Sequence, residues 1–278
     1  MPEGDTIFRA ARTLSLALAG RVVTRFDTGY AHLATVDAGR PVAGRTVETV
    51  EARGKHLLMS LSDDLILVTH MRMSGSWHVY RPGESWQKAR SRARIVLETE
   101  AFVAVGFDVP VARFLTAAAL ARDPQLRSLG PDLLDTGFST KQALANLAAG
   151  EGREVAEALL DQRVMAGLGN VFKSEVLFMA GVNPFALVAD LDLTTRARLV
   201  QLARTSIRDN ALDPQVQAPT YTGLRRTTRR ADPRARLWVY GRSGQPCRRC
   251  GTPIVERKQG VHARTTFFCP TCQPPRRP

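Results

Sequence analysis

The four cysteines of this 278-residue chain constrain its carboxyl end more than any other feature of the sequence. Cys247, Cys250, Cys269 and Cys272 follow the pattern C-x2-C-x18-C-x2-C. Two close pairs separated by about 15–20 residues are typical of a four-thiolate zinc site. Because all four ligands are protein atoms, we predict a single structural Zn²⁺ with no open position for a catalytic water. The alternative, a pair of disulfides, is disfavoured in a chain that we expect inside the cell.

Positive charge is concentrated in the same part of the chain. The formal net charge is +13, and residues 225–278 hold fourteen Arg and Lys side chains against two acidic ones. The first 224 residues are close to neutral, with 25 basic and 24 acidic side chains. A disordered solubilising tail would explain the charge alone, but the paired cysteines predict a folded module there. We therefore expect this module to have an anionic partner.

Apolar patterning indicates a globular chain outside membranes. Apolar residues make up 44% of the sequence, which is enough for a buried core. The chain has no run of about 18 apolar residues, so we predict no membrane span. Its start lacks the basic stretch, apolar block and cleavage site of a signal peptide. We expect a cytoplasmic protein.

The first residues, Met1-Pro2-Glu3-Gly4, predict a reactive amino terminus. Pro2 is small, so removal of Met1 would expose a secondary amine whose pKa lies near ~8. Such an amine attacks the anomeric carbon of a sugar and forms a Schiff base. Glu3 stands beside it and is a candidate to move protons. The alternative is that these residues are frayed and carry no function, as most chain ends do.

The first half of the chain predicts one helix followed by a series of strands. Apolar residues recur on one face over residues 5–19, with Asp5 placed to cap this helix and Gly20 to end it. Several short strands separated by turn residues predict a two-sheet sandwich or a barrel. The predicted strands are residues 22–26, 46–51, 56–61, 65–69, 76–80, 93–97 and 102–106.

The second half predicts helices and then a separate module. Segments that are rich in Ala and Leu, or that carry an apolar stripe, predict helices over residues 111–122, 139–149, 153–165, 171–180 and 194–210. Residues 123–135 contain two prolines and a glycine and predict a connection, and residues 214–236 predict a linker. The predicted domains are residues 1–122, 123–236 and 237–278.

Single residues in this half carry weaker signals. The turn Gly167-Leu168-Gly169-Asn170 separates two predicted helices, and Asn170 is well suited to cap the second one. Helix starts bind phosphate through their backbone amides and dipole. An ordinary corner between two helices explains the same residues. Taken alone, four further residues also have an ordinary explanation as surface, basic-module or core side chains: Lys55, Arg72, Met73 and Arg264.

Taken in order along the whole chain, these motifs resemble those of the formamidopyrimidine-DNA glycosylase and endonuclease VIII family of base-excision repair enzymes. Each motif is moderately specific, and their occurrence in the right order is highly specific. The resemblance implies an α+β multidomain fold with an amino-terminal β-sandwich and leading helix, a helix–two-turn–helix domain and a zinc-finger β-hairpin. The matching segments are Met1-Pro2-Glu3-Gly4, Arg53-Gly54-Lys55, Leu160-Asp161-Gln162-Arg163, Gly167-Leu168-Gly169-Asn170, Val239-Tyr240-Gly241-Arg242 and Arg264-Thr265-Thr266-Phe267-Phe268-Cys269-Pro270.

The resemblance implies a bifunctional DNA glycosylase and AP lyase with four catalytic residues. The damaged base is flipped out of the helix so that its glycosidic bond can be reached. Pro2 would attack the sugar and expel the base, with Glu3 as general acid/base. Lys55 would hold phosphate and assist β-elimination. Arg264, at the tip of the finger hairpin, would grip the phosphates of the lesion and assist δ-elimination.

The resemblance also implies DNA contacts and a cellular setting. Asn170 would contact the phosphate backbone, while Arg72 and Met73 match the loop that fills the hole left by the flipped nucleotide, a role that suits an apolar wedge. The implied partner is damaged double-stranded DNA, bound by a monomer; single-stranded or bubble DNA stays open as a further substrate. The implied location is the bacterial cytoplasm, on the nucleoid through DNA binding.

Gly4, together with the absence of one family run, places the chain nearer the endonuclease VIII branch, which removes oxidised pyrimidines such as thymine glycol. Gly4 is followed by Asp5-Thr6, so a carboxylate common at position 6 is lost. Residues 108–114 replace the Asp-Pro-Arg-Arg-Phe run with which the formamidopyrimidine branch holds the orphaned partner base. A family arginine corresponds to Ser128, with Arg127 beside it, and that contact stays open.

Two alternative functions stay open on the sequence. The first is a non-catalytic protein that binds damaged or abasic DNA with the same fold, for which the altered residues 5 and 6 leave room. The second is a glycosylase of the formamidopyrimidine type that prefers purines. A free Pro2 distinguishes the enzyme from the non-catalytic protein, because binding alone has no need of it.

Overall fold

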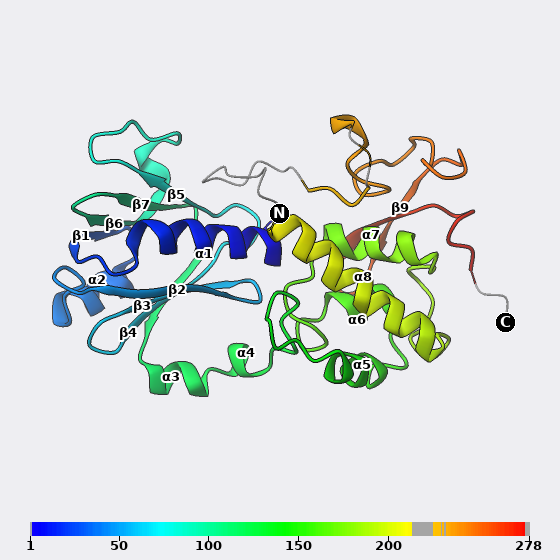
Figure 1. Cartoon of the computed structure of the whole chain (residues 1–278), viewed down its shortest axis with the longest axis horizontal. Coiled ribbons are helices and arrows are strands. Elements are labelled where there is room, and N and C mark those ends of the chain that lie inside the picture. Colours follow the sequence, from blue (N-terminus) through cyan, green and yellow to red (C-terminus); the bar gives the residue numbers. More distant parts are fainter. Residues whose placement is uncertain (1, 213–224, 229, 231, 276–278) are drawn as a thin grey trace. The chain divides into compact units, whose positions relative to one another are not determined.

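The computed structural model describes residues 2–212, 225–228, 230 and 232–275 (Figure 1). Its contacts separate two compact units, residues 2–127 and residues 128–212 with 225–275. Much of the predicted linker over residues 214–236 lies outside the described residues. The predicted boundary between a helical domain and a finger at residue 237 stays a prediction. In the described part of the chain, no helix has the length and apolar character needed to cross a membrane.

The first unit is a β-sandwich with a leading helix, α1 (Gly4–Leu18), as predicted. Its two antiparallel sheets have the strand orders β1-β6-β7-β5 and β2-β3-β4-β8. All seven predicted strands are present, with ends that differ by at most two residues. The strands are β1 (Val23–Thr28), β2 (Val47–Arg53), β3 (His56–Leu61), β4 (Leu65–His70), β5 (Ser76–Tyr80), β6 (Ala93–Thr99), β7 (Val103–Phe107) and β8 (Val111–Leu115).

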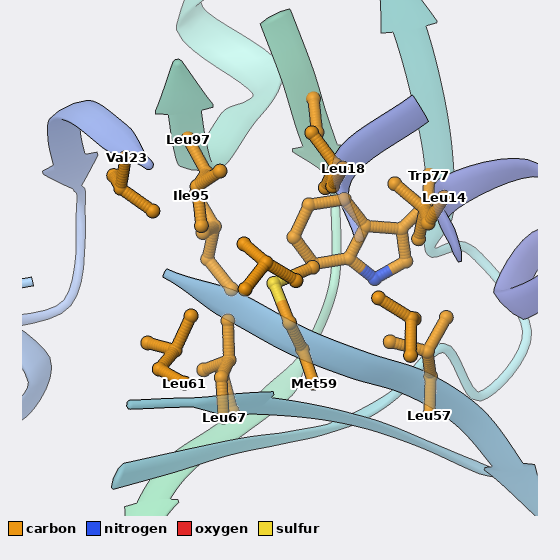
Figure 2. Packing of buried hydrophobic residues seen from close by; sticks show 14 of the residues in the cluster. Leu14, Leu18, Val23, Leu57, Met59, Leu61, Leu67, Trp77, Ile95 and Leu97 are labelled. Carbon is orange, nitrogen blue, oxygen red and sulfur yellow. The ribbon is translucent and has the colours of Figure 1, made fainter. Parts of the chain in front are cut away.

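An apolar core joins α1 to both sheets (Figure 2). Leu14 and Leu18 of α1 pack in one cluster with Met59 of β3 and Trp77 of β5, and each is at most 2% exposed. Burying a side chain of this size contributes about 2 kcal/mol. Trp77 Nε1 donates to Thr69 Oγ1 (3.2 Å), which satisfies the one polar atom of the indole. This packing fixes the position of α1, and with it the start of the chain.

Two details of the first unit differ from the predictions. Residues 31–39 form a helix, α2 (Ala31–Gly39), that was not predicted. The predicted helix over residues 111–122 is wrong in its first part, because Val111–Leu115 pairs with β4 as β8 and only α3 (Ala117–Arg122) is helical. Thr116 separates the two by accepting a hydrogen bond from Ala119 N–H (3.1 Å). A short helix, α4 (Pro124–Arg127), and the 3-10 turn η1 (Arg90–Arg92) complete the unit.

Two predicted helix caps are also wrong. Glu3, and not Asp5, occupies the N-cap position of α1, and Asp5 lies in the first turn. Gly169, and not Asn170, is the N-cap of α7, so Asn170 is the first helical residue. In both cases the helix begins one or two residues earlier than a search for capping side chains indicates.

The second unit combines helices with a β-hairpin. Its helices are α5 (Thr140–Ala148), α6 (Val155–Leu160), α7 (Asn170–Ala180) and α8 (Leu193–Ala211), with a 3-10 turn η2 (Pro233–Ala235). The hairpin pairs β9 (Val255–Gln259) with β10 (Arg264–Phe268). The predicted helix over residues 153–165 ends early, at Leu160. Asp161 ends it, because its carboxylate accepts from Arg153 Nη1 (2.9 Å) and from the backbone N–H of Arg163 (3.0 Å).

Candidate active site

The predicted reactive terminus is held at the start of α1. Pro2 is half-buried, and Glu3 is fully buried. The backbone carbonyl of Glu3 accepts hydrogen bonds from the N–H groups of Thr6 (2.9 Å) and Ile7 (3.1 Å), so the helix begins at this residue. α1 packs in turn against β2 and β3. Pro2 and Glu3 therefore lie on a structured segment and not on a frayed end.

Lys55 lies in the two-residue turn that joins β2 to β3. Arg53 and His56 pair across this turn. Gly54 has φ +59°, a left-handed conformation that glycine adopts without steric cost. Lys55 is half-buried and stands at the end of the sheet against which α1 packs.

Two histidines beside this turn are held in the neutral form. His56 and His70 face each other across β3 and β4, and their rings meet edge to face with centroids 4.9 Å apart. Burial, with nearby cations, lowers the pKa of His56 and lowers the pKa of His70 to about 4. Neutral rings at pH 7 add no positive charge next to Lys55. Neither histidine was assigned a role from the sequence.

Arg72 and Met73 lie in residues 71–75, the loop between β4 and β5, which we call the wedge loop. Arg72 has φ +45°, and its backbone N–H donates to His70 Nδ1 (3.0 Å). The side chain of Met73 is 67% exposed, although it is large and apolar. Such exposure suits a residue that inserts between bases. The wedge role stays a prediction.

Asn170 begins α7, and its side chain is used inside the second unit. It is 6% exposed. Its Nδ2 donates to the carbonyl oxygen of Thr265 (2.8 Å), and its Oδ1 accepts from Lys173 Nζ (2.8 Å). Lys173, only 1% exposed, also donates to Thr266 Oγ1 (2.6 Å). The start of α7 is thereby bonded to the strand that carries Arg264, and the phosphate contact of Asn170 stays a prediction.

Arg264 is exposed at the start of β10, beside the hairpin turn. That turn lies against the Glu157 side chain of α6, and Gly260 in it has φ +68°, a left-handed conformation that favours glycine. Gln259 Nε2 donates to Glu154 Oε2 (2.7 Å), and Gln259 Oε1 accepts from the Thr266 hydroxyl (2.7 Å). The exposed Arg264 therefore stands on a hairpin that is bonded to both α6 and α7.

The four cysteines converge as predicted. Their Sγ atoms all lie within 4.8 Å of one another. Tetrahedral zinc with Zn–S bonds of about 2.3 Å requires Sγ–Sγ separations of roughly 3.8 Å. The separations of 3.9 Å for Cys247–Cys272 and 3.5 Å for Cys250–Cys269 fit that geometry.

The chemistry of these thiols also fits a dication. Burial raises the pKa of Cys269 and Cys272, and their neighbouring thiols raise them further. Four thiolates so close together need a bound cation to stay deprotonated. The backbone N–H groups of Arg249 and Cys272 point to Cys247 Sγ and Cys269 Sγ (both 3.4 Å) and support the ligands. The zinc is structural.

A buried carboxylate joins α7 to the segment that leads into the finger. Glu175 is 0% exposed. Its oxygens accept from the backbone N–H groups of Trp238 (2.8 Å), Val239 (2.9 Å) and Tyr240 (2.9 Å), and from the Thr227 hydroxyl. Burial raises the pKa of Glu175, and these four donors oppose the rise. Residues 238–240 are thereby fixed to α7 immediately before the first zinc ligands.

The predicted residues fall into two groups. Pro2, Glu3, Lys55 and the wedge loop belong to the first unit, on α1 and on the turns at the ends of β2 and β4. Asn170, Arg264 and the zinc site belong to the second. The first group offers an amine, a carboxylate and a cation for chemistry on a sugar. The second offers the exposed guanidinium of Arg264 on a metal-supported frame, as expected for phosphate. These are the groups expected of the class of DNA glycosylases with AP lyase activity.

Comparisons with known proteins agree with this class. The chain matches the formamidopyrimidine-DNA glycosylase N-terminal domain over residues 1–108, the H2TH domain of the same glycosylase over residues 129–215, and a zinc finger found in FPG and IleRS over residues 244–275. The chain belongs to the formamidopyrimidine-DNA glycosylase and endonuclease VIII family. The predicted fold, the structural zinc and the assignment to base-excision repair as a glycosylase and lyase are confirmed at this level.

The relatives are named as endonucleases and lyases. The chain is 44% identical to a Streptomyces coelicolor "Probable endonuclease 8 2", over 98% of this chain and 94% of that one. It is 41% identical to the Mycolicibacterium smegmatis "DNA-(apurinic or apyrimidinic site) lyase Nei2", over 98% and 99%. An Escherichia coli "Endonuclease 8" is 33% identical over 98% and 100%.

Solved structures show the same fold. A Lactococcus lactis Fpg in complex with DNA that contains an abasic site aligns with a TM-score of 0.79 at 22% identity, over 98% of this chain and all of that one. A MutM complex with DNA that contains carbocyclic 8-oxo-G aligns with a TM-score of 0.80 at 22% identity, over 99% and all of it. These alignments confirm the three-part architecture predicted from the sequence.

Sequence reasoning missed the buried polar residues of the second unit. Lys173 and Glu175 stand in an apolar helix, and that was the available signal: charged side chains are rarely fully buried unless they are paired. Apart from Asn170, the partners described above lie 52 to 93 residues further along the chain, from Thr227 to Thr266. The spacing of residues in the sequence therefore gives no indication of what Lys173 and Glu175 bind.

Proposed function

We propose that this enzyme removes oxidised pyrimidines from damaged duplex DNA through a Schiff base on Pro2 and then cuts the strand by β,δ-elimination. The observation that carries the proposal is the burial of Glu3 at the start of α1, next to Pro2. A buried carboxylate beside a terminal secondary amine is suited to proton transfer during base loss.

The chemistry runs from the amine to the sugar. The Pro2 nitrogen attacks C1′, the bond between C1′ and the base breaks, and the base leaves with a proton. Glu3 supplies and removes the protons of base loss and of ring opening, which leaves a Schiff base between Pro2 and C1′. Loss of a C2′ proton then expels the 3′ phosphate, and a second elimination expels the 5′ phosphate. Hydrolysis returns the Pro2 amine.

Lys55 and Arg264 act on the phosphates in this scheme. A cation near each leaving phosphate stabilises the negative charge that grows as its C–O bond breaks. Lys55 serves the β-elimination and Arg264 the δ-elimination. Asn170 contacts the backbone, and Arg72 with Met73 fills the space of the flipped nucleotide. The product is a gapped strand with a phosphate at both ends.

The preference for pyrimidines has two supports. The relatives that cover nearly the whole chain are named endonuclease 8. Residues 108–114 read Asp-Val-Pro-Val-Ala-Arg-Phe, so this turn lacks the arginine pair with which the formamidopyrimidine branch holds the partner base. We also propose that the protein acts as a monomer on duplex DNA in the bacterial cytoplasm.

A panel of labelled oligonucleotides tests the activity. Duplexes carrying thymine glycol, dihydrouracil, 8-oxoguanine or an abasic site are incubated with protein whose intact mass shows that Met1 has been removed. We expect strand cutting with phosphates at both ends, fastest at thymine glycol and dihydrouracil, and loss of base release in Glu3→Gln. Fastest cutting at 8-oxoguanine would contradict the pyrimidine preference. Binding without cutting at any site would favour the non-catalytic alternative.

The salt dependence of DNA binding gives a second test of the proposal. Because Lys and Arg contacts to phosphate release counterions, affinity for abasic-site DNA should fall steeply between low and moderate salt. An affinity that does not change with salt would count against the proposed phosphate contacts. The same titration with single-stranded and bubble DNA ranks these substrates against the duplex.

A further inference from the structure

The turn between β7 and β8 lies against the wedge loop, and we propose that Asp108 in this turn positions Met73 for eversion of the damaged base. The inference rests on the wedge role given to Met73 in the proposed function. It adds a positioning residue, Asp108, that touches neither the sugar nor the base.

The wedge loop is a tight turn that packs on the backbone of its neighbour. Gly75 N–H donates to the carbonyl oxygen of Met71 (2.9 Å), and Met71 is 2% exposed. A Cβ atom at Gly75 would lie 2.8 Å from Met71 O and 3.1 Å from Val109 Cα. The loop and the β7–β8 turn are therefore in direct backbone contact. The Ser74 hydroxyl adds a hydrogen bond to the carbonyl oxygen of Asp108 (3.4 Å).

The β7–β8 turn is fixed from its other side. Val109 is fully buried, and its carbonyl oxygen accepts from the hydroxyl of Tyr30. Asp108 N–H donates to the carbonyl oxygen of Arg92 (2.9 Å). The wedge loop thus packs against a turn that is itself held by Tyr30, the N-cap residue of α2, and by Arg92 at the end of η1.

Asp108 is held in an uncommon backbone conformation by its own carboxylate. Its φ is +49°, in the left-handed region that side chains other than Asn and Asp rarely adopt. Its Oδ1 accepts from Arg92 Nε (3.1 Å), and its Oδ2 lies 2.5 Å from Arg92 Nη2. The Arg92 guanidinium lowers the pKa of Asp108, so the carboxylate stays charged at neutral pH. These contacts offset the cost of the left-handed conformation.

A second cation links Asp108 to the far end of the wedge loop. Lys88 Nζ lies 3.8 Å from Asp108 Oδ2 and donates to Ser76 Oγ (2.9 Å). Ser76 begins β5, immediately after the wedge loop. Asp108 therefore contacts the loop in two ways: its main-chain carbonyl accepts from Ser74, and its carboxylate attracts Lys88, which donates to Ser76. Met73, 67% exposed, depends on this support for a defined position.

The test separates base eversion from later chemistry. Single-turnover rates are measured for wild type, Met73→Ala, Asp108→Asn, Asp108→Ala and the control Asp27→Asn on two duplexes, one with dihydrouracil and one with an abasic site. Asp27 is a matched carboxylate that forms an exposed ion pair with Arg25 on β1 of the same unit. A fluorescent base analogue beside the lesion reports eversion directly by stopped flow. Thermal unfolding of each variant reports on stability.

We expect Asp108→Ala to lower the ratio of the dihydrouracil rate to the abasic-site rate about tenfold, since small misplacements of a positioning loop are costly. Eversion should slow in proportion, as it should in Met73→Ala, and the double variant should add little to either single change. Asp108→Asn, which keeps an acceptor and tolerates the left-handed conformation, should be intermediate. Asp27→Asn should match wild type.

Other results would contradict either the role of Asp108 or the proposed function itself. An Asp108→Ala protein that slows both duplexes equally, or neither, overturns the inference, as does a normal eversion rate in Met73→Ala, since Asp108 then has nothing to position. Failure of the proposed function would give a different result: the Pro2→Gly variant would cut both duplexes as fast as wild type does. A lower melting temperature without a change in the rate ratio would show a structural role alone.

Discussion

The two units of this enzyme hold their predicted functional residues by different means. In the first unit, Pro2 and Lys55 stand at the ends of elements joined by an apolar core that contains Leu14, Met59 and Trp77 (Figure 2). In the second unit, Asn170 and Arg264 depend on buried polar groups and on four cysteines. An apolar core is non-directional and tolerates small changes, whereas a buried polar network fails when one partner is lost. Phosphate binding should therefore be easier to disrupt than the fold that carries the nucleophile.

Removal of zinc should give the largest difference between the units. Chelation is expected to weaken binding to abasic-site DNA about 100-fold, because folding of the finger depends on the metal. Hydrogen exchange measured across the chain should show lost protection in residues 244–275 and unchanged protection in residues 2–127. Added zinc should restore both protection and binding. Equal loss of protection in both units would break the comparison.

Loss of the Glu175 carboxylate should give the next largest effect, on the stability of the second unit. In Glu175→Gln, one carboxylate oxygen becomes an amide that cannot accept from all four donors, which should cost about 2–3 kcal/mol of unfolding free energy. Denaturant unfolding of this variant is compared with Glu151→Gln, which changes an exposed glutamate of the same unit. A loss below about 0.5 kcal/mol, the usual range for surface changes, would show that the four hydrogen bonds are not what fixes residues 238–240.

The Lys173→Met variant tests how far the second unit depends on one buried polar group. The change keeps most of the side-chain volume but removes the donor to Asn170 and Thr266, and should weaken DNA binding about tenfold, in line with 1–2 kcal/mol for buried hydrogen bonds. Titration of abasic-site DNA into the variant gives the affinity, with Lys141→Met on the exposed face of α5 as the control. If both lysine variants lose affinity equally, simple loss of charge is the better explanation.

The smallest expected effect is on the acid stability of the first unit. Burial lowers the pKa of His70 and of His78 to about 4, below the value of about 6.5 in an unfolded chain. The unfolded chain therefore binds more protons, so this contribution to stability is complete above about pH 6.5 and is lost as pH falls toward 4. His78→Gln should flatten that dependence by about 1–2 kcal/mol. Thermal unfolding at several pH values tests this, with His262→Gln in the exposed hairpin turn as the control; an unchanged pH slope in His78→Gln would refute it.

The sequence was most informative where structure follows from local pattern. The seven strands from Val23 to Phe107 were predictable because each is a short apolar run bounded by turn residues, and the zinc site because its four ligands form two close pairs in the sequence. The segment 111–115 was assigned to a helix with the Ala-rich residues that follow it, whereas its pairing with β4 depends on residues far away in the sequence. The early end of α6 at Leu160 has a similar cause, since the Asp161 carboxylate redirects the chain.

The candidate site shows the same contrast between local sequence signals and long-range contacts. Pro2, Glu3, Lys55 and Arg264 were found because short motifs surround them, and their roles stay predictions. Lys173, Glu175 and Asp108 act through partners elsewhere in their units, so no local spacing indicates them. Of these, only Asp108 was noticed in the sequence, and then for the run that it replaces and not for its contacts with Arg92 and Lys88.

Borohydride trapping with mapping of the adduct tests the central claim most directly. The enzyme is incubated with dihydrouracil and abasic-site duplexes, reduced, digested and analysed by mass spectrometry. The account predicts a stable protein–DNA complex whose modified peptide begins at Pro2 and whose yield collapses in Pro2→Gly. An adduct on Lys55 or any other lysine, or trapping that is unchanged in Pro2→Gly, would contradict it.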